Sequence, residues 1–401
     1  MKSAYIVATT RTPIGNLAGG LSGVRADDLA AHAIKHLLQK VPHLLPDAIE
    51  DLIMGCANQA GEDNRNVARM ALLLAGLPYT VAGETVNRLC ASGMAATVNA
   101  ARIIACSDAE LVIAGGVEQM TRAPWVISKT SQAFGRDAQM YDSSFGWRFV
   151  NPLMEASYGT DSMGMTAENL AERYQIDRLS QDQFAAWSQQ KAHQAQKAGY
   201  FDAEISPLSI SQKKGDALLF DQDEFLKPHT TVENLAKLRP AFKPNGTVTA
   251  GNASGLNDGA AALLLASEKA LQQFDLSPIA RIVATGVAGV EPRIMGIGPV
   301  EASRKALQKA GRSMAEMDII ELNEAFAAQC LACIRQWGLD DKDPRINPNG
   351  GAIALGHPLG MSGARIIQTA ALQLQRSQKT FALCTMCVGV GQGYAVVLER
   401  C

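Results

Sequence analysis

The chain has 401 residues, enough for two or three domains of ordinary size. Hydrophobic residues make up 47% and charged residues 19%, a composition that excludes a disordered chain and supplies a large core. Lys and Arg total 37 against 39 Asp and Glu, which gives a formal net charge of -2. This balance argues against a nucleic-acid-binding protein, because phosphate contacts need a clustered basic surplus.

Eight cysteines are scattered along the chain. A small secreted scaffold would concentrate them into a dense disulfide framework, so we expect reduced thiols instead. The N-terminal segment reaches Arg11 before any secretory apolar core develops, and no stretch approaches the ~20 apolar residues that cross a bilayer. The sequence therefore predicts a soluble, cytoplasmic protein whose partners include neither nucleic acid nor a membrane.

The first 120 residues alternate β-branched segments with Ala-rich segments, a succession typical of an α/β protein. The segment 85–89 leads through Cys90-Ala-Ser-Gly into an Ala-rich helix, which is followed by an apolar strand. In chain order, we expect strands at 4–9, 52–56 and 111–114, and helices at 26–38, 66–75 and 94–105.

The middle of the chain, from about residue 121 to about residue 247, is more polar and is interrupted by prolines. Two segments within it, 166–174 and 180–198, have helical spacing, and the second opens with the capping-type sequence Ser180-Gln-Asp-Gln. Because both helices carry apolar stripes, we interpret the middle as an inserted, lid-like subdomain rather than a linker.

Beyond this insertion the early pattern returns. Ile6-Val-Ala-Thr recurs as Ile282-Val-Ala-Thr, and Cys90-Ala-Ser-Gly-Met-Ala-Ala aligns with His357-Pro-Leu-Gly-Met-Ser-Gly. An Ala-rich helix and then an apolar strand follow both the Cys90 segment and the His357 segment. Two matches in the same order favour an internal duplication. The duplication places Cys90 and His357 at equivalent turns, each at the N-terminal end of a helix.

Cys90 and His357 are therefore the first candidates for catalysis. Unsatisfied N–H groups at a helix N-terminus favour a thiolate over a thiol, although a buried structural cysteine is the common alternative. His357 is one of only six histidines and lies between Gly356 and Pro358 in a glycine-rich turn. Such a turn brings the backbone close to a ligand and fixes the side chain.

Two Cys-x-x-Cys pairs, Cys330/Cys333 and Cys384/Cys387, suggest a zinc or redox site. Residues three apart on a strand point to opposite faces, and the first pair lies within the helical segment 324–337. We therefore expect no metal centre. The run Gly389-x-Gly-x-Gly is also a poor dinucleotide fingerprint, because strand-like residues follow it instead of a helix.

Two polar residues lie at the ends of apolar segments. Asn323 follows the apolar run 318–320, where an Asn is ordinarily a helix N-cap. Ser254 lies in a glycine-punctuated turn that we expect to precede a helix, where it would bind a phosphate or amide or merely cap that helix.

Taken together, five segments resemble the thiolase family of acetyl-CoA acyltransferases over essentially the whole chain. Segments 55–69 and 146–153 look most like the 3-oxoadipyl-CoA thiolases of aromatic-compound breakdown. The five motifs are Cys90-Ala-Ser-Gly, Gly251-Asn-Ala-Ser-Gly-Leu-Asn-Asp-Gly, Asn323-Glu-Ala-Phe-Ala, Asn349-Gly-Gly-Ala-Ile-Ala-Leu-Gly-His-Pro-Leu-Gly and Cys387-Val-Gly-Val-Gly-Gln-Gly.

The resemblance implies an α/β protein with a duplicated thiolase fold, layered α-β-α-β-α with two mixed five-stranded sheets. Residues 1–270 would form the N-terminal half, with a loop domain at 121–247 that covers the CoA, and residues 271–401 would form the C-terminal half. A homodimer or a homotetramer is the implied assembly.

The implied reaction is CoA-dependent, reversible cleavage of a 3-oxoacyl-CoA to acetyl-CoA and a shortened acyl-CoA. Cys90 would be the nucleophile, His357 would take its proton, and Cys387 would protonate the leaving enolate and then activate CoA. His357 and a water on Asn323 would hold the enolate oxygen, and the backbone N–H groups of Cys90 and Gly389 the tetrahedral oxygen. CoA takes part as a substrate, and no permanently bound cofactor or metal is implied.

The same resemblance implies which residues bind the CoA thioester. Lys227 would lie near the nucleotide of CoA. The pantetheine channel and substrate pocket would be lined by Ser254, Ala250, Phe242, Met163 and Met295.

The acyl group remains open at this stage. Ser162 replaces the His of many acetoacetyl-CoA thiolases, yet Met163-Gly replaces the Met-Pro frequent in oxoadipyl-like enzymes. For a dicarboxylic substrate, Arg65, Arg69 or Arg148 would meet the distal carboxylate, or these arginines would serve a subunit interface. The alternatives are an acetoacetyl-CoA or fatty 3-oxoacyl-CoA thiolase, a ketosynthase-type condensing enzyme, and a non-enzymatic cysteine-rich metal or redox protein.

Overall fold

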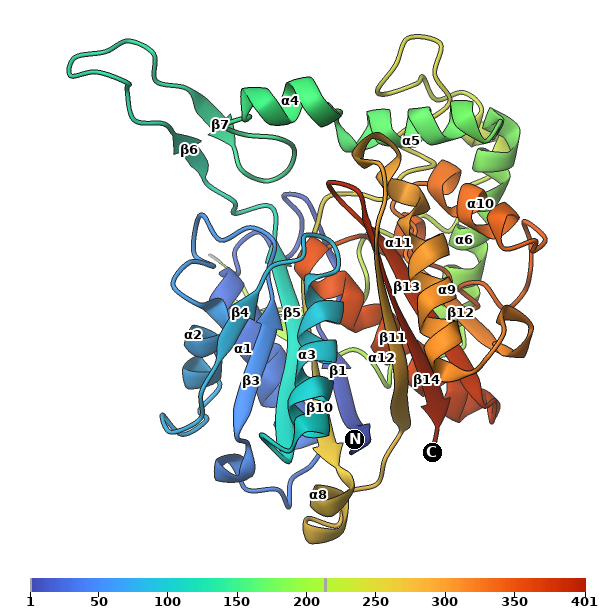
Figure 1. Cartoon of the computed structure of the whole chain (residues 1–401). Coiled ribbons are helices and arrows are strands. Elements are labelled where there is room, and N and C mark those ends of the chain that lie inside the picture. The colour runs from blue at the N-terminus through green and yellow to red at the C-terminus, as the bar shows by residue number, and fades with distance from the viewer. Residues whose placement is uncertain (1, 213–214) are drawn as a thin grey trace.

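One mixed β-sheet runs through the molecule and is built from strands at both ends of the chain (Figure 1). The structure is a computed structural model that describes residues 2–212 and 215–401. The strands are ordered β12-β13-β14-β11-β1-β10-β5-β3-β4, with β2 paired to β10.

The N-terminal part of the chain supplies one side of this sheet, together with β10, which follows the insertion. Its strands are β1 (Ala4–Arg11), β2 (Gly15–Asn16), β3 (Asp51–Gly55), β4 (Glu84–Val86), β5 (Leu111–Gln119) and β10 (Asn257–Ser267). Its helices are α1 (Ala26–Gln39), η1 (Pro46–Ala48), α2 (Val67–Leu74), α3 (Ser92–Cys106) and α8 (Glu268–Gln273).

The C-terminal part supplies the other side. Its strands are β11 (Ala280–Gly289), β12 (Ile319–Leu322), β13 (Phe381–Val388) and β14 (Gln392–Arg400). Its helices are η2 (Pro292–Ile297), α9 (Gly298–Ala310), η3 (Met314–Glu316), α10 (Ala327–Gln336), α11 (Ala352–Leu355) and α12 (Leu359–Ser377).

The two expected five-stranded sheets differ from the structure in two details. They join edge to edge, because Ala4–Ile6 of β1 pairs antiparallel with Ala280–Ile282 of β11. The fifth strand of the second sheet is reduced to a single bridge between Ile320 and Ile346. The mixed α/β architecture is otherwise the one expected, with five strands from β4 to β1 and four from β11 to β12.

A matching irregularity in the two halves supports the duplication. Strand β1 shifts register between Ile6 and Ala8 where it pairs with β10. Strand β11 shifts register between Ile282 and Ala284 where it pairs with β14. Both shifts fall at the same place in the recurring Ile-Val-Ala-Thr motif, so the two copies share a β-bulge as well as a sequence.

Helices α3 and α12 form the middle of the molecule and pack on each other between the two halves of the sheet (Figure 1). Helices α1 and α2 cover the outer face of the N-terminal half, and α9 covers that of the C-terminal half. Alternate residues of β10 face different layers, because Leu263 and Leu265 join the central core and Leu264 the outer one. This alternation produces the expected α-β-α-β-α layering.

The central position of α3 corrects one expectation about the sequence. Residues Leu89–Cys106 form one stretch that is long and apolar enough to cross a membrane by length and composition alone. Most of this stretch is buried inside the protein. Its apolar character therefore reflects burial between two sheets rather than contact with lipid.

The inserted segment adds helices and small hairpins above the sheet. Its helices α5 and α6 match the two expected, although α6 is capped by Asp177, whose carboxylate accepts the N–H of Ser180 at 2.8 Å. The expected loop domain, residues 121–247, includes residues 213–214, which lie outside the described residues. The elements are β6 (Trp125–Ile127), β7 (Met140–Asp142), α4 (Pro152–Tyr158), α5 (Met163–Arg173), α6 (Arg178–Lys197), β8 (Leu208–Ile210), β9 (Leu218–Phe220) and α7 (Val232–Leu235).

A buried ion-pair network fastens the insertion to the sheet. The guanidinium of Arg11, at the end of β1, lies 2.9 Å from Glu204 and 2.7 Å from Asp223. All three side chains are almost fully buried. Because an unpaired buried charge is costly, these residues fix where the inserted segment lies on the core.

Glycines allow the central helices to approach the sheet. A Cβ atom on Gly116 of β5 would overlap the carbonyl oxygen of Gly360 at the start of α12, and one on Gly93 of α3 would also crowd that oxygen. Only hydrogen fits in this space. The first turns of α3 and α12 are therefore held against each other and against β5.

Replacing Gly116 with Ala is expected to destabilise the protein by about 3 kcal/mol or more, because the new methyl group meets backbone rather than a movable side chain. Urea unfolding followed by circular dichroism measures this loss. Gly23→Ala is the matched control, since a Cβ there has no neighbour within 4 Å, and it should change stability by less than about 0.5 kcal/mol. Equal stability of the two variants would contradict the proposed close packing.

Candidate active site

Cys90 lies in the tight turn between β4 and α3, two residues before the helix begins. The preceding residue, Leu89, has a left-handed backbone with φ of 46°, and its N–H donates to the Asn87 side chain at 2.8 Å. The Cys90 side chain is buried, with 9% of its surface exposed. The turn thus presents the thiol at the N-terminal end of a central helix, as the sequence predicts.

His357 occupies the equivalent turn before α12 and is also buried. Its backbone N–H donates to the Asn257 side chain at 2.9 Å, and the N–H of Gly360 donates to Glu118 at 2.7 Å. The imidazole Nδ1 lies 2.6 Å from Oγ of Ser362. The backbone and the ring of His357 are therefore both held by buried polar side chains.

The loop after β13 completes the site. Cys387 lies near the end of this strand and is fully buried, and Gly389 follows the strand. The N–H of Gly389 and the N–H of Cys90 both face the Cys90 thiol. A Cβ on Gly389 would lie 3.0 Å from Leu89, so the two turns touch. The arrangement places two backbone donors beside one sulfur.

Asn323 lies beside the imidazole ring of His357. It directly follows β12, and its Nδ2 lies 3.4 Å from Nε2 of His357. Asn323 is not a helix N-cap, the ordinary alternative for an Asn at this point, because α10 begins at Ala327 with Phe326 in the capping position. The buried Oδ1 of Asn323 has no partner among the described residues. This orphaned acceptor suits a bound water.

Burial controls the charges in this site. It raises the pKa of Cys90 to about 11, although the N–H groups of Gly389 and Cys90 act in the opposite direction. Burial also raises the pKa of Cys387 well above its ordinary value. Burial, with a contribution from the charge of Arg365, lowers the pKa of His357 to about 3. The thiolate expected at Cys90 is therefore corrected: at neutral pH the resting site holds neutral thiols and a neutral imidazole.

Three of the residues predicted to bind CoA lie close to this site. Met163 begins α5, and its Sδ is 4.0 Å from the Cβ position at Gly389. Phe242 covers Gly164 and meets the ring of Phe326 edge-on, with 6.2 Å between centroids. Ser254 donates from Oγ to the carbonyl of Ala325 at 3.1 Å. The helix expected after Ser254 is wrong, since the chain continues into strand β10.

The other three residues predicted to bind CoA are Ala250, Met295 and Lys227. Ala250 is exposed in the loop before β10, and Met295 is buried in η2. Lys227 is exposed, with its ammonium 4.8 Å from the ring centre of Phe225. Contact of these three residues with CoA stays a prediction.

The two Cys-x-x-Cys pairs do not form a four-thiol centre. Cys384 packs in the central core, whereas Cys387, Cys330 and Cys333 pack in the outer core of the C-terminal half. Cys333 donates to the carbonyl of Gly296 at 3.2 Å, and Cys384 donates to that of Ile366 at 3.5 Å. Cys333 and Cys384 are protonated structural thiols, and all eight cysteines are free.

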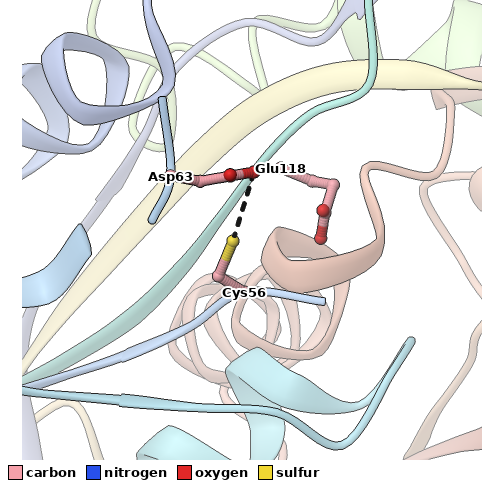
Figure 2. A group of neighbouring side chains, drawn as sticks. All are labelled: Cys56, Asp63 and Glu118. Carbon is pink, nitrogen blue, oxygen red and sulfur yellow. Dashed lines mark hydrogen bonds between the residues drawn. The ribbon is translucent and has the colours of Figure 1, made fainter. Parts of the chain in front are cut away.

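Figure 2 shows Cys56, Asp63 and Glu118, whose side chains lie close together. Their donor atoms are close enough to hold a metal, but they are already engaged in hydrogen bonds. Cys56 donates to the carbonyl of Asn58 at 2.8 Å, and burial raises its pKa well above its ordinary value. Glu118 accepts backbone N–H groups of residues 57, 58 and 360. This cluster therefore ties the turn before α12 to the loop after β3.

The sequence did not identify Ser362, Asn257 or Glu118 as parts of this site. Ser362 is in the first turns of α12, five residues after His357, and that spacing could have suggested a contact. Asn257 and Glu118 reach the His357 turn from other strands, 100 and 242 residues away from their partners. No local pattern signals contacts at such separations.

Comparison with known proteins identifies the family. Residues 4–269 match "Thiolase, N-terminal domain" and residues 276–400 match "Thiolase, C-terminal domain". The chain is 58% identical over 400 residues to a "Beta-ketoadipyl-CoA thiolase" of Escherichia coli, covering 100% of both chains. It is 57% identical, with the same coverage, to a "3-oxoadipyl-CoA/3-oxo-5,6-dehydrosuberyl-CoA thiolase" of Escherichia coli strain K12.

A solved structure gives the same result. The crystal structure of the Bacillus anthracis acetyl-CoA acetyltransferase superposes with a TM-score of 0.93 at 40% identity, covering 100% of this chain and 99% of that one. Full-length sequence identity, the two domain matches in order and the shared fold show that the chain belongs to the thiolase family of acyltransferases.

Proposed function

We propose that this enzyme cleaves 3-oxoadipyl-CoA with CoA, giving acetyl-CoA and a shortened acyl-CoA. The observation that carries the reaction is that the starts of α3 and α12, after Cys90 and His357, lie together, with Cys387 near Cys90 and Asn323 near His357. The names of the Escherichia coli relatives support the choice of acyl group. An acetoacetyl-CoA or fatty 3-oxoacyl-CoA substrate is the alternative, supported by the name of the Bacillus anthracis enzyme.

The first half-reaction forms an acyl-cysteine. The Cys90 sulfur attacks the 3-oxo carbon while its proton moves to His357, whose imidazole is kept neutral by burial before the reaction. The bond between C2 and C3 then breaks, and its electron pair leaves as the enolate of acetyl-CoA. Cys387 donates its proton to C2 of this enolate. The raised pKa of Cys387 suits this step, because the thiol stays protonated until a strong base forms.

The second half-reaction returns the enzyme to its starting state. The Cys387 thiolate takes the proton of an incoming CoA thiol, and the CoA sulfur attacks the acyl carbon. The Cys90 thiolate leaves and recovers its proton from His357. Negative charge on the tetrahedral oxygen is stabilised by the N–H groups of Cys90 and Gly389. Charge on the enolate oxygen is stabilised by His357 and by a water held at the free Oδ1 of Asn323.

CoA and its thioesters are the partners of this reaction, with no metal or resident cofactor required. The pantetheine arm would pass Met163, Phe242 and Ser254 under the inserted segment. Ala250 and Met295 would line the same channel, and Lys227 would lie near the CoA nucleotide.

A cation beside the site would favour a dicarboxylic acyl group. Arg69 and Arg148 donate to backbone carbonyls, Arg65 lies in an exposed loop, and none of the three lines the pocket beside Met163. A small pocket beside Met163 and Val390 is instead lined by Arg293, which pairs with Asp161 at 2.9 Å. We infer that Arg293 meets the distal carboxylate.

Two further features complete the proposal. The hairpin of β6 and β7 projects from the body and exposes the apolar side chains of Trp125, Ile127 and Met140, which supports a homodimer or homotetramer (Figure 1). We place the enzyme in the cytoplasm, where a reducing environment keeps Cys90 and Cys387 from forming a disulfide.

We also propose that the chain divides into the halves 1–270 and 271–401, with 121–247 inserted in the first. The paired β-bulges and the equivalent starts of α3 and α12 support this division.

Purified protein mixed with CoA and 3-oxoadipyl-CoA should consume the 3-oxoacyl absorbance, faster than with acetoacetyl-CoA. Cys90→Ser should abolish acylation of the enzyme, because no nucleophile remains. Cys387→Ser should still be acylated, as seen by mass spectrometry, but should lose proton exchange at C2 of acetyl-CoA. Absence of turnover with every 3-oxoacyl-CoA would refute the proposed function.

Alkylation of Cys90 by iodoacetamide should rise about tenfold per pH unit between pH 7 and 9.5. A thiol whose pKa is about 11 gains thiolate throughout this range, whereas a thiolate–imidazolium pair would react at a constant rate. Mass spectrometry of the Cys90 peptide separates this reaction from that of the exposed Cys106 and Cys401. A rate independent of pH would contradict the neutral resting state.

Arg293→Met should lower kcat/KM for 3-oxoadipyl-CoA by about 10-fold or more and leave acetoacetyl-CoA nearly unchanged, because only the former carries a distal carboxylate. Arg173→Met is the matched control, since Arg173 forms an exposed pair with Glu291 at the same 2.9 Å. Equal losses for both substrates would remove Arg293 from substrate selection.

A further inference from the structure

His357 belongs to a buried chain of hydrogen bonds that the sequence motifs do not reveal. Its Nδ1 lies 2.6 Å from Oγ of Ser362, and that Oγ lies 2.9 Å from the carbonyl oxygen of Pro358. On the opposite side of the ring, Nε2 lies 3.4 Å from Nδ2 of Asn323. Ser362 is fully buried, so water does not compete for its hydroxyl group.

The bond from Ser362 to Pro358 sets the direction of this chain. The hydroxyl group of Ser362 donates its single hydrogen to the Pro358 carbonyl, which also accepts the backbone N–H groups of Met361 and Ser362. The Ser362 oxygen must then accept a hydrogen from Nδ1 of His357. In a neutral imidazole only one nitrogen carries hydrogen, so Nε2 is left as the acceptor. The Nδ2 amide group of Asn323 can then donate to the unprotonated Nε2 of His357.

We propose that Ser362 is a positioning residue that holds His357 in the tautomer with Nδ1 protonated and Nε2 unprotonated. Nε2 is the ring nitrogen that faces Asn323 and not Ser362, and the proposed function requires it to accept the proton of Cys90. In the other tautomer Nε2 would carry hydrogen and could not take the proton of Cys90. Ser362 itself touches neither the substrate nor Cys90 in this role, which rests on the proposed function.

Comparison of the two repeat copies shows that helix packing does not require a hydroxyl group at the position of Ser362. Aligning Cys90 with His357 places Ala95 of α3 at the position of Ser362 of α12. Ala95 is buried in the central core. The turn-and-helix unit therefore forms with a methyl group at this position, and the copy that needs an oriented ring is the one that carries a hydroxyl group.

The test compares Ser362→Ala with Ser362→Thr. The alanine variant should lower kcat for thiolysis by about 10- to 100-fold with KM within about twofold, as expected when the partner of a functional histidine is lost. The threonine variant keeps the hydroxyl group and should recover most of kcat. Ser303→Ala removes another buried hydroxyl group, in α9, and should leave both constants unchanged.

A second measurement does not depend on activity. In protein labelled with 15N-histidine, the His357 signals are assigned by their loss in His357→Gln. Wild type and Ser362→Thr should show Nδ1 protonated and Nε2 unprotonated, whereas Ser362→Ala should show a mixture or the reverse. Unchanged tautomers in Ser362→Ala, or equal kcat losses in the alanine and threonine variants of folded protein, would overturn the proposal. Failure of turnover in wild type with the expected tautomer would instead refute the proposed function alone.

Discussion

The active site depends on how closely two backbones approach each other. Helices α3 and α12 begin at one place because Gly93, Gly116 and Gly360 have no side chains to separate them. Each helix carries its functional residue two positions before its first turn. The same contact that completes the central layer therefore also brings Cys90 and His357 to one end of the sheet. The packing of the two helices and the placement of Cys90 and His357 therefore depend on the same backbone contact.

Burial is the second property that shapes the chemistry. A helix N-terminus favours negative charge, but removing a sulfur from water opposes it more strongly at Cys90. The same loss of water keeps His357 uncharged. Without a reaction partner, the candidate site therefore holds neutral thiols and a neutral imidazole.

The two copies of the duplication differ in the residue that precedes the central helix. The β-bulges of β1 and β11 and the starts of the two central helices are retained in both copies. One copy carries a sulfur and the other an imidazole with its own hydrogen-bond partner, Ser362. The insertion belongs to one copy only and is fixed to the core by the buried Arg11. A repeated scaffold thus supports two different chemical groups at equivalent positions.

The sequence by itself determined the α/β class, the duplication and the equivalent positions of Cys90 and His357, because these follow from local periodicity and repeated motifs. It was wrong about the element after Ser254, where a glycine-rich turn commonly precedes a helix but here leads into strand β10. Only the tertiary structure showed that Asn323 faces His357 and that Glu118 and Asn257 hold its turn. It also decided the charge of Cys90. Contacts between distant segments and the loss of water on burial are properties of the folded chain, so no local pattern records them.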